Sequence, residues 1–146
     1  MITIAELESM EWSVVETSHE DRPIWYRWRL FRDDFPKNVM PTRLNIFWQM
    51  EEINNEGMPT QSEFERMKLF EDRLVDSVEF DCHSILSIVI TTNSKREFVF
   101  HTGDPEEFIE RLSEMPQDES RYPIRIIQNA DLQWDYDARV ISSALT

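Results

Sequence analysis

Apolar residues recur every three or four positions in two stretches of the chain, the spacing that gives a helix one apolar face. The first stretch covers residues 61–80 and follows a capping box in which Thr60 and Glu63 satisfy free backbone donors at the helix start. Its apolar side chains are Phe64, Met67, Phe70, Leu74 and Val78. The second stretch covers residues 105–115 and begins after Asp104, a favourable N-cap. The pattern therefore predicts two surface helices.

β-branched and aromatic residues dominate several shorter runs, a composition typical of strands. The runs at residues 84–92 and 96–101 are separated by a join of hairpin length. The first of them is apolar on both faces, as in a central strand, whereas the second alternates between apolar and polar residues. Further strands are expected at residues 12–17, 24–31, 44–50 and 124–127.

The order of these elements predicts an α+β fold. Within residues 43–128 the order is strand, helix, strand, strand, helix, strand, which is typical of the ferredoxin-like βαββαβ fold, an antiparallel sheet with two helices on one face. We expect residues 12–31 to extend this sheet as an N-terminal β-hairpin. Residues 131–146 form a C-terminal segment that we expect to fold back on the sheet and to cover the face bearing Trp25 and Arg27. Residues 1–146 are expected to be a single domain.

The charge of the chain narrows its possible partners. Its 146 residues include 29 acidic and 15 basic residues, a formal net charge of −14. Such a chain binds nucleic acid and anionic membranes poorly, and no apolar run is long enough to span a bilayer. Residues 1–20 lack the features of a secretory signal, and the single cysteine, Cys82, fits a reducing compartment. We therefore expect a cytoplasmic protein with no nucleic-acid or membrane partner.

Residues suited to catalysis or metal binding are few and poorly spaced. Cys82 and His83 are adjacent, so on a strand their side chains would point to opposite faces. No other His or Cys spacing matches a zinc site, and two glycines cannot form a glycine-rich phosphate loop. The sequence thus predicts no catalytic residue, no metal and no cofactor, and we expect that the protein is not an enzyme.

Arginine and aromatic residues are mixed in the strand expected at 24–31. Residues 22–43 contain six basic and two acidic residues, so this segment carries +4 and the rest of the chain −18. One interpretation is stacking and pairing of guanidinium groups on an exposed sheet face, which balances the acidic helices. The other is an interface, because Trp, Tyr and Arg dominate binding hot spots. The candidate interface residues are Trp25, Arg27, Arg29 and Trp48.

Acidic residues concentrate around the first predicted helix. Ten of the 31 residues at 51–81 are Asp or Glu, against three Lys or Arg. Glu71 and Asp72 are neighbours in the middle of the helix, where adjacent side chains diverge and cannot converge on one substrate atom. We interpret both as solvated, and as candidate interface residues for a basic protein partner that such a field would attract.

Several motifs, in the right order, resemble one known family. They include Trp25 to Arg29 (WYRWR), Thr92 to Asp104 (TNSKREFVFHTGD), Tyr122 to Ile126 (YPIRI) and Asp131 to Tyr136 (DLQWDY). Residues 12–136 as a whole resemble the bacterial family called domain of unknown function 695. The resemblance implies an α+β domain and brings no reaction or catalytic residues. A looser similarity of architecture links such domains to the ribonuclease E inhibitor B family, small acidic proteins that bind an enzyme.

Two functions from different classes remain open. The first is a regulatory, inhibitor-like or immunity-like protein that docks on a basic protein through its acidic surface. The second is a small-ligand-binding or homo-oligomeric assembly module that uses the face bearing Arg27 and Arg29. The sequence leaves open whether the protein is a monomer or a homodimer.

Overall fold

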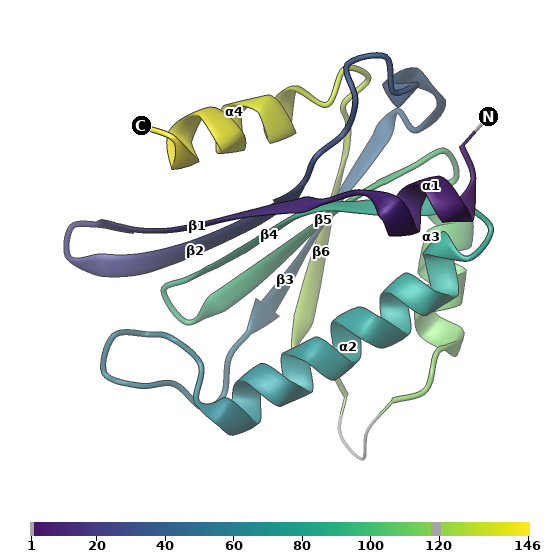
Figure 1. Ribbon diagram of the computed structural model, residues 1–146. Helices are drawn as coiled ribbons and strands as arrows, with labels where there is room; N and C mark the ends of the chain where they lie inside the picture. Colours follow the sequence, from purple (N-terminus) through teal and green to yellow (C-terminus); the bar gives the residue numbers. More distant parts are fainter. Residues whose placement is uncertain (1, 118–120) are drawn as a thin grey trace.

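The computed structural model describes residues 2–117 and 121–146. In that part of the chain, one six-stranded antiparallel sheet combines with four α-helices and a short 3-10 helix at Lys37–Val39. Figure 1 shows the sheet at the centre, with helices on both sides. The predicted α+β class is confirmed.

The sheet has the strand order β1-β2-β4-β5-β3-β6. In chain order the strands are β1 (Trp12–His19), β2 (Arg22–Arg29), β3 (Thr42–Gln49), β4 (Ser84–Thr92), β5 (Lys95–Thr102) and β6 (Ile124–Ala130). All six were expected, and their ends differ from the predicted ones by up to three residues. The N-terminal hairpin β1–β2 extends the sheet as expected, because β2 pairs with β4.

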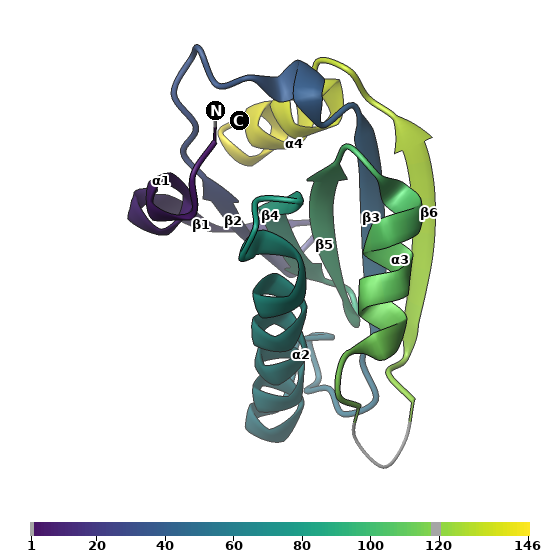
Figure 2. The same cartoon turned by 90° about the vertical axis from the view of Figure 1, so that its right-hand side faces the viewer.

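One face of the sheet is covered by α2 (Gln61–Glu79) and α3 (Pro105–Glu114), the two helices predicted from periodicity. Figure 2 shows them together on this face. Thr60 and Asp104 accept hydrogen bonds from backbone N–H groups three residues on, as expected of N-caps. The apolar stripes of both helices pack on inward-facing residues of β3, β4 and β5, which forms the larger core of the molecule.

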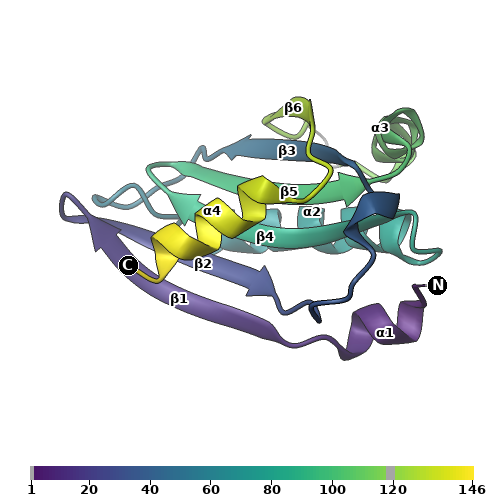
Figure 3. The ribbon, with the colours of Figure 1, turned by 90° about the horizontal axis from the view of Figure 1, so that it is seen from above.

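The opposite face is covered by α4 (Asp135–Ala144), which crosses the sheet in Figure 3 with α2 behind it. The C-terminal segment therefore does fold back on the sheet, as expected, and it does so as a helix that the pattern did not predict. Trp134 anchors it: the indole is 2% exposed, stacks on His101 at 3.9 Å between ring centres, and donates a hydrogen bond to the carbonyl of Met40. Asp131 accepts hydrogen bonds from the backbone N–H groups of Asp135 and Tyr136 and so caps the helix. A short helix, α1 (Ile4–Ser9), was also not predicted.

Candidate functional site

A row of four side chains runs across the sheet beneath the N-terminal half of α2. Trp25 on β2 is opposite Thr91 on β4, Thr91 is opposite Arg96 on β5, and Arg96 is opposite Trp48 on β3. Residues directly opposite in an antiparallel pair project from the same face, so all four project toward α2. Phe64 of α2 lies above this row, with its ring centre 5.2 Å from the guanidinium carbon of Arg96.

The sheet extends beyond α2 on the side of the hairpin, and this leaves a groove of about 370 Å³ between them. Its floor includes apolar side chains of β1, β2 and β4, and its wall is formed by α2. The residues that matter most below are Trp25, Phe64, Lys68, Glu71, Val89 and Arg96. We call this space the α2–hairpin groove. Most of its surface is apolar, with a few charged groups, a composition typical of ligand sites.

Toward the C-terminal end of α2, arginines of β2 pair with glutamates of the helix. Arg27 donates to Glu71 at 2.5 Å, and Arg29 contacts both carboxylate oxygens of Glu79 at 3.2 and 3.4 Å. Each guanidinium carbon also lies 4.8 Å from the ring centre of Trp12, so that one indole faces both cations. We call these five residues the paired ladder. It attaches the hairpin to α2.

The Arg29–Glu79 pair of the ladder is buried, with each side chain no more than 7% exposed. Burial raises the pKa of Glu79. The charge of Arg29 and the hydrogen bonds from Arg29 and from the backbone N–H of Leu86 act to lower it, but burial has the larger effect, so the pKa stays above its usual value. The carboxylate of Glu79 and the two terminal nitrogens of Arg29 are thus satisfied by groups of the protein itself, whereas the buried Nε of Arg29 has no hydrogen-bond partner in the described part of the chain. Arg27 and Arg29 are stacked and paired, as one of the two interpretations expected, but α2 covers the face that bears them, so this face is not exposed as that interpretation had it.

Arg96 differs from these arginines because none of the described carboxylates forms an ion pair or hydrogen bond with it. Only 5% of the residue is exposed, and its Nε donates to Thr91 Oγ1 at 2.8 Å. In the described part of the chain its two terminal nitrogens have no hydrogen-bond acceptor and no ion pair. Burial lowers the pKa of Arg96 to about 10; Glu71 acts against this shift and Arg27 adds to it. A largely buried arginine therefore lines the groove, and its two terminal nitrogens keep some access to solvent there.

The groove brings together three of the six predicted interface residues, Trp25, Arg27 and Glu71. Arg29 is 8% exposed and is engaged in the ladder. Asp72 is exposed as predicted and pairs with Lys68 at 3.0 Å beside the groove.

Three expectations about these residues were wrong. Trp48 is fully buried under α2 and donates its indole N–H to Glu63, so it cannot be an interface residue. Glu63 binds this indole and the N–H of Glu51 instead of completing a capping box. Glu71 is only 14% exposed and paired with Arg27 rather than solvated. Trp48 is covered because α2 lies over this sheet face, and the alternation within a strand does not reveal which positions a helix will cover. Glu63 and Glu71 belong to that helix and are bound by side chains of the sheet, Trp48 and Arg27, which are distant in the sequence.

The expected cover for the arginine face was also wrong. We expected the C-terminal segment around Trp134 to lie over the face bearing Trp25 and Arg27. It packs instead on the opposite face, against Trp28 of β2 and Ile88 of β4. The groove beside α2 is therefore left open by α4.

Sequence reasoning missed Arg96, Phe64 and Lys68 as site residues. A signal for Arg96 was available, because it precedes Phe98 and Phe100 by two and four positions and so shares their inward face. A charged residue in phase with core phenylalanines must either find a partner or line a cavity. Arg96 lines a cavity, the α2–hairpin groove.

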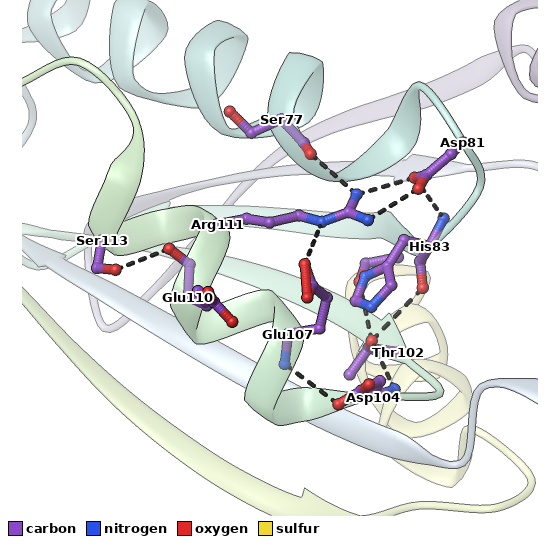
Figure 4. A network of polar contacts seen from close by, with 10 residues as sticks. Ser77, Asp81, His83, Thr102, Asp104, Glu107, Glu110, Arg111 and Ser113 are labelled. Atoms are coloured by element: carbon purple, nitrogen blue, oxygen red, sulfur yellow. Dashed lines mark hydrogen bonds and ion pairs between the residues drawn. The ribbon is translucent and has the colours of Figure 1, made fainter.

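A separate polar network joins the C-terminal end of α2 to α3 (Figure 4). Arg111 donates to both carboxylate oxygens of Asp81, to Glu107 and to the carbonyl of Ser77. Cys82 follows in the same turn, and burial, with the negative charges of Asp81 and Glu79, raises the pKa of its thiol. A thiol held in the protonated form is a poor nucleophile, and the contacts of Arg111 join the end of α2 to α3.

Within residues 2–117 and 121–146, His, Cys, Asp and Glu side chains form no group of three or more that could hold a metal ion. None of the helices described there has the length and apolar character needed to cross a membrane.

Comparison with protein families finds one match: residues 10–137 fit the model described as "Family of unknown function (DUF695)". No curated protein and no solved structure matches the chain.

Proposed function

The chain belongs to the family of unknown function DUF695, which assigns it no activity, and from this premise we propose that it is a non-catalytic binding module that receives an anionic ligand in the α2–hairpin groove. The observation that carries the proposal is Arg96, which is 5% exposed as a residue, lines the groove and has no carboxylate partner among the described residues. Removing a charge from water without a partner costs several kcal/mol. A bound carboxylate or sulfonate supplies that partner through charge-assisted hydrogen bonds.

The charges around the groove support this choice of ligand. Three cations, Arg27, Lys68 and Arg96, and two carboxylates, Glu16 and Glu71, line it. The groove therefore has a net positive charge in a protein whose total is −14. A positive site inside an acidic protein favours a small anion at close range and does not attract polyanions such as nucleic acid.

Binding without catalysis is proposed because the described lining lacks an activated nucleophile. It contains no His or Cys, and Glu71 is held by Arg27 at 2.5 Å and so is not available as a free base. The hydroxyl of Thr91 accepts a hydrogen bond from Arg96 Nε, which does nothing to activate it. A screen that finds reproducible turnover, abolished by Glu71→Gln, would overturn this part of the proposal.

The anion site is tested with 1-anilinonaphthalene-8-sulfonate, an aromatic anion whose fluorescence rises on binding. We expect saturable binding at one site, weakened at least tenfold by Arg96→Met. Arg125→Met is the matched control, because Arg125 is an exposed arginine on the edge strand β6, away from the groove. Equal dye binding by the wild type and the Arg96→Met variant would refute the proposal.

A second candidate function rests on a different observation, the exposed carboxylates of α2 and the loop before it. Arginines such as Arg27, Arg29 and Arg43 are engaged in internal ion pairs, whereas Glu52, Glu56, Glu65 and Asp76 are exposed. Such a surface favours encounter with a basic protein, as in an inhibitor or immunity protein. Both functions are proposed for a cytoplasmic protein with a single cysteine.

This candidate is tested by affinity capture from the native host at several salt concentrations. A basic partner should be retained at low salt, released as salt is raised, and lost with the triple variant Glu52→Gln, Glu56→Gln, Glu65→Gln. Capture that is unchanged by salt and by this variant would count against the acidic surface as the interface with a basic protein.

We also infer that residues 43–128 form a ferredoxin-like core. Two observations support this: the neighbour order β4-β5-β3-β6 within the sheet, and the position of α2 and α3 on one face. An experimental structure in which β3 does not lie between β5 and β6 would contradict the inference.

A further inference from the structure

We propose that the groove selects a small monocarboxylate with an aromatic or branched apolar body. The carboxylate binds the terminal nitrogens of Arg96, and the apolar body lies against Trp25, Phe64 and Val89. Glu71 excludes ligands that carry a second negative charge. This inference rests on the proposed anion site and adds the class of ligand that the site accepts.

The first step is the position of Arg96 relative to the apolar lining. Arg96 projects from β5 beneath Phe64, and the opposing residue Thr91 fixes its Nε. The two terminal nitrogens therefore present a planar fork, the geometry that matches a carboxylate. Trp25 and Val89 line the same groove, so a ligand anchored at Arg96 has apolar surface available beside its charged end.

The second step is the fixed negative charge of Glu71. Its carboxylate lines the groove, is 14% exposed, and is held in place by Arg27 at 2.5 Å. Glu71 and Arg96 line the same groove, and the charge of Glu71 acts to raise the pKa of Arg96 against the effect of burial. One ligand carboxylate can share Arg96 with Glu71, but a second carboxylate on the same ligand has no free cation inside the groove and meets Glu71 or Glu16 instead.

The third step concerns size. A groove of about 370 Å³ lies near the lower limit for ligand pockets. It takes a compact acid or a single terminal residue of a peptide and excludes large cofactors. Lys68 lies at the groove as well, but its side chain is 62% exposed and paired with Asp72, so it contributes little selectivity.

The experiment is calorimetric titration of the full chain with four probes: 4-phenylbutyrate, its neutral amide, phenylsuccinate as a dianion, and butyrate, which lacks the ring. We expect 4-phenylbutyrate to bind at least tenfold more tightly than each of the others. Arg96→Met should abolish this preference. Arg96→Lys, which keeps the charge but loses the planar fork, should retain weaker binding.

Two further variants test the role assigned to Glu71. Glu71→Gln should improve phenylsuccinate binding at least tenfold relative to 4-phenylbutyrate. Asp72→Asn is the matched control, because Asp72 is the next residue of α2 and does not line the groove. Thermal unfolding of each variant verifies that it is folded.

A peptide chain end offers the same chemistry as a free acid. A hexapeptide that ends in phenylalanine with a free carboxylate distinguishes the two sources. Tighter binding of this peptide than of 4-phenylbutyrate supports the proposal with a chain end as the source, whereas tighter binding of the amidated peptide overturns it.

The failures of the two proposals are distinguishable. Anion binding that depends on Arg96 but is equal for phenylsuccinate, butyrate and 4-phenylbutyrate overturns the ligand class and leaves the anion site intact. If no probe and no aromatic sulfonate binds in an Arg96-dependent way, the proposed function itself fails.

Discussion

Two arginines on the same face of the same sheet, Arg29 and Arg96, are both nearly buried beneath α2, yet their surroundings differ. Arg29 lies toward the C-terminal end of α2 and contacts both oxygens of Glu79. Arg96 lies beneath the N-terminal half and has no ion pair in the described part of the chain. The first region is closed by charges that the protein supplies, whereas the second is open to a groove. A buried charge thus belongs to a structural contact in the first region, and in the second region it is the basis of the binding site that we propose.

The difference follows from the cost of leaving a buried charge without a partner. Removing one member of a buried ion pair costs about 3–5 kcal/mol, because the remaining charge is stranded. Removing a buried charge that has no partner costs far less and can increase stability. Substitutions in the two regions should therefore have opposite consequences, and the predictions below test this contrast.

The largest effect is expected for Arg29→Met. This change leaves Glu79 buried without its cation and should lower the free energy of unfolding by about 3–5 kcal/mol. Urea denaturation followed by circular dichroism measures it. A loss below about 1 kcal/mol would mean that the paired ladder does not hold the hairpin to α2.

A double variant, Arg29→Met with Glu79→Gln, should recover about 2 kcal/mol of that loss, because no buried charge remains unpaired. A glutamine at this position can still accept the hydrogen bond from the N–H of Leu86. The same denaturation experiment on the single and double variants gives the coupling between the two sites. If the double variant is less stable than Arg29→Met alone, the account of the ladder is wrong.

The pH dependence of stability provides a third test, with a defined sign. Burial raises the pKa of Glu79 in the folded protein above its unfolded value of 4.5. Between pH 4.5 and the raised pKa, the folded state therefore binds more protons than the unfolded state. The stabilisation that Glu79 contributes is full below pH 4.5 and is lost as pH rises through the raised pKa. Relative to Glu79→Gln, the wild type should lose stability as pH rises across this range. A relative gain would contradict the burial assigned to this carboxyl.

The smallest effect is expected for Lys68→Gln, at the groove. Lys68 pairs with Asp72 in solvent, with side chains 62% and 54% exposed. Its removal should change the free energy of unfolding by no more than about 0.5 kcal/mol. A loss of 2 kcal/mol or more would show that the open region also depends on charges for its structure.

The sequence was sufficient to predict α2, because the helix has both a regular apolar stripe and an N-cap, Thr60. It was not sufficient to predict α4, since Asp131, four residues before Asp135, supplies the cap from outside the helix and Trp134 has a left-handed backbone conformation. Trp134 is fixed by contacts with His101 and Met40, which are distant in the sequence. Tertiary contacts of this kind leave no local pattern.

Prediction of the candidate site from the sequence was limited in the same way, because tertiary contacts decide its composition. Trp25, Arg27 and Glu71 could be selected by residue type and position, and the structure does bring them together. Which residues are structural and which line the proposed site depends on where α2 lies over the sheet. Its position covers Trp48 and leaves Arg96 at the edge of a groove. Alternation along a strand gives the face of each residue and not the element packed on it.

The stability of Arg96→Met, measured beside Arg29→Met under the same conditions, tests the central claim most directly. If Arg96 is held for a ligand and not for the fold, the variant should unfold at the same urea concentration as the wild type or at a higher one, with a gain of up to about 4 kcal/mol. A loss of about 3 kcal/mol or more, equal to that of Arg29→Met, would show that Arg96 is a structural residue and would contradict the account of the groove as a binding site.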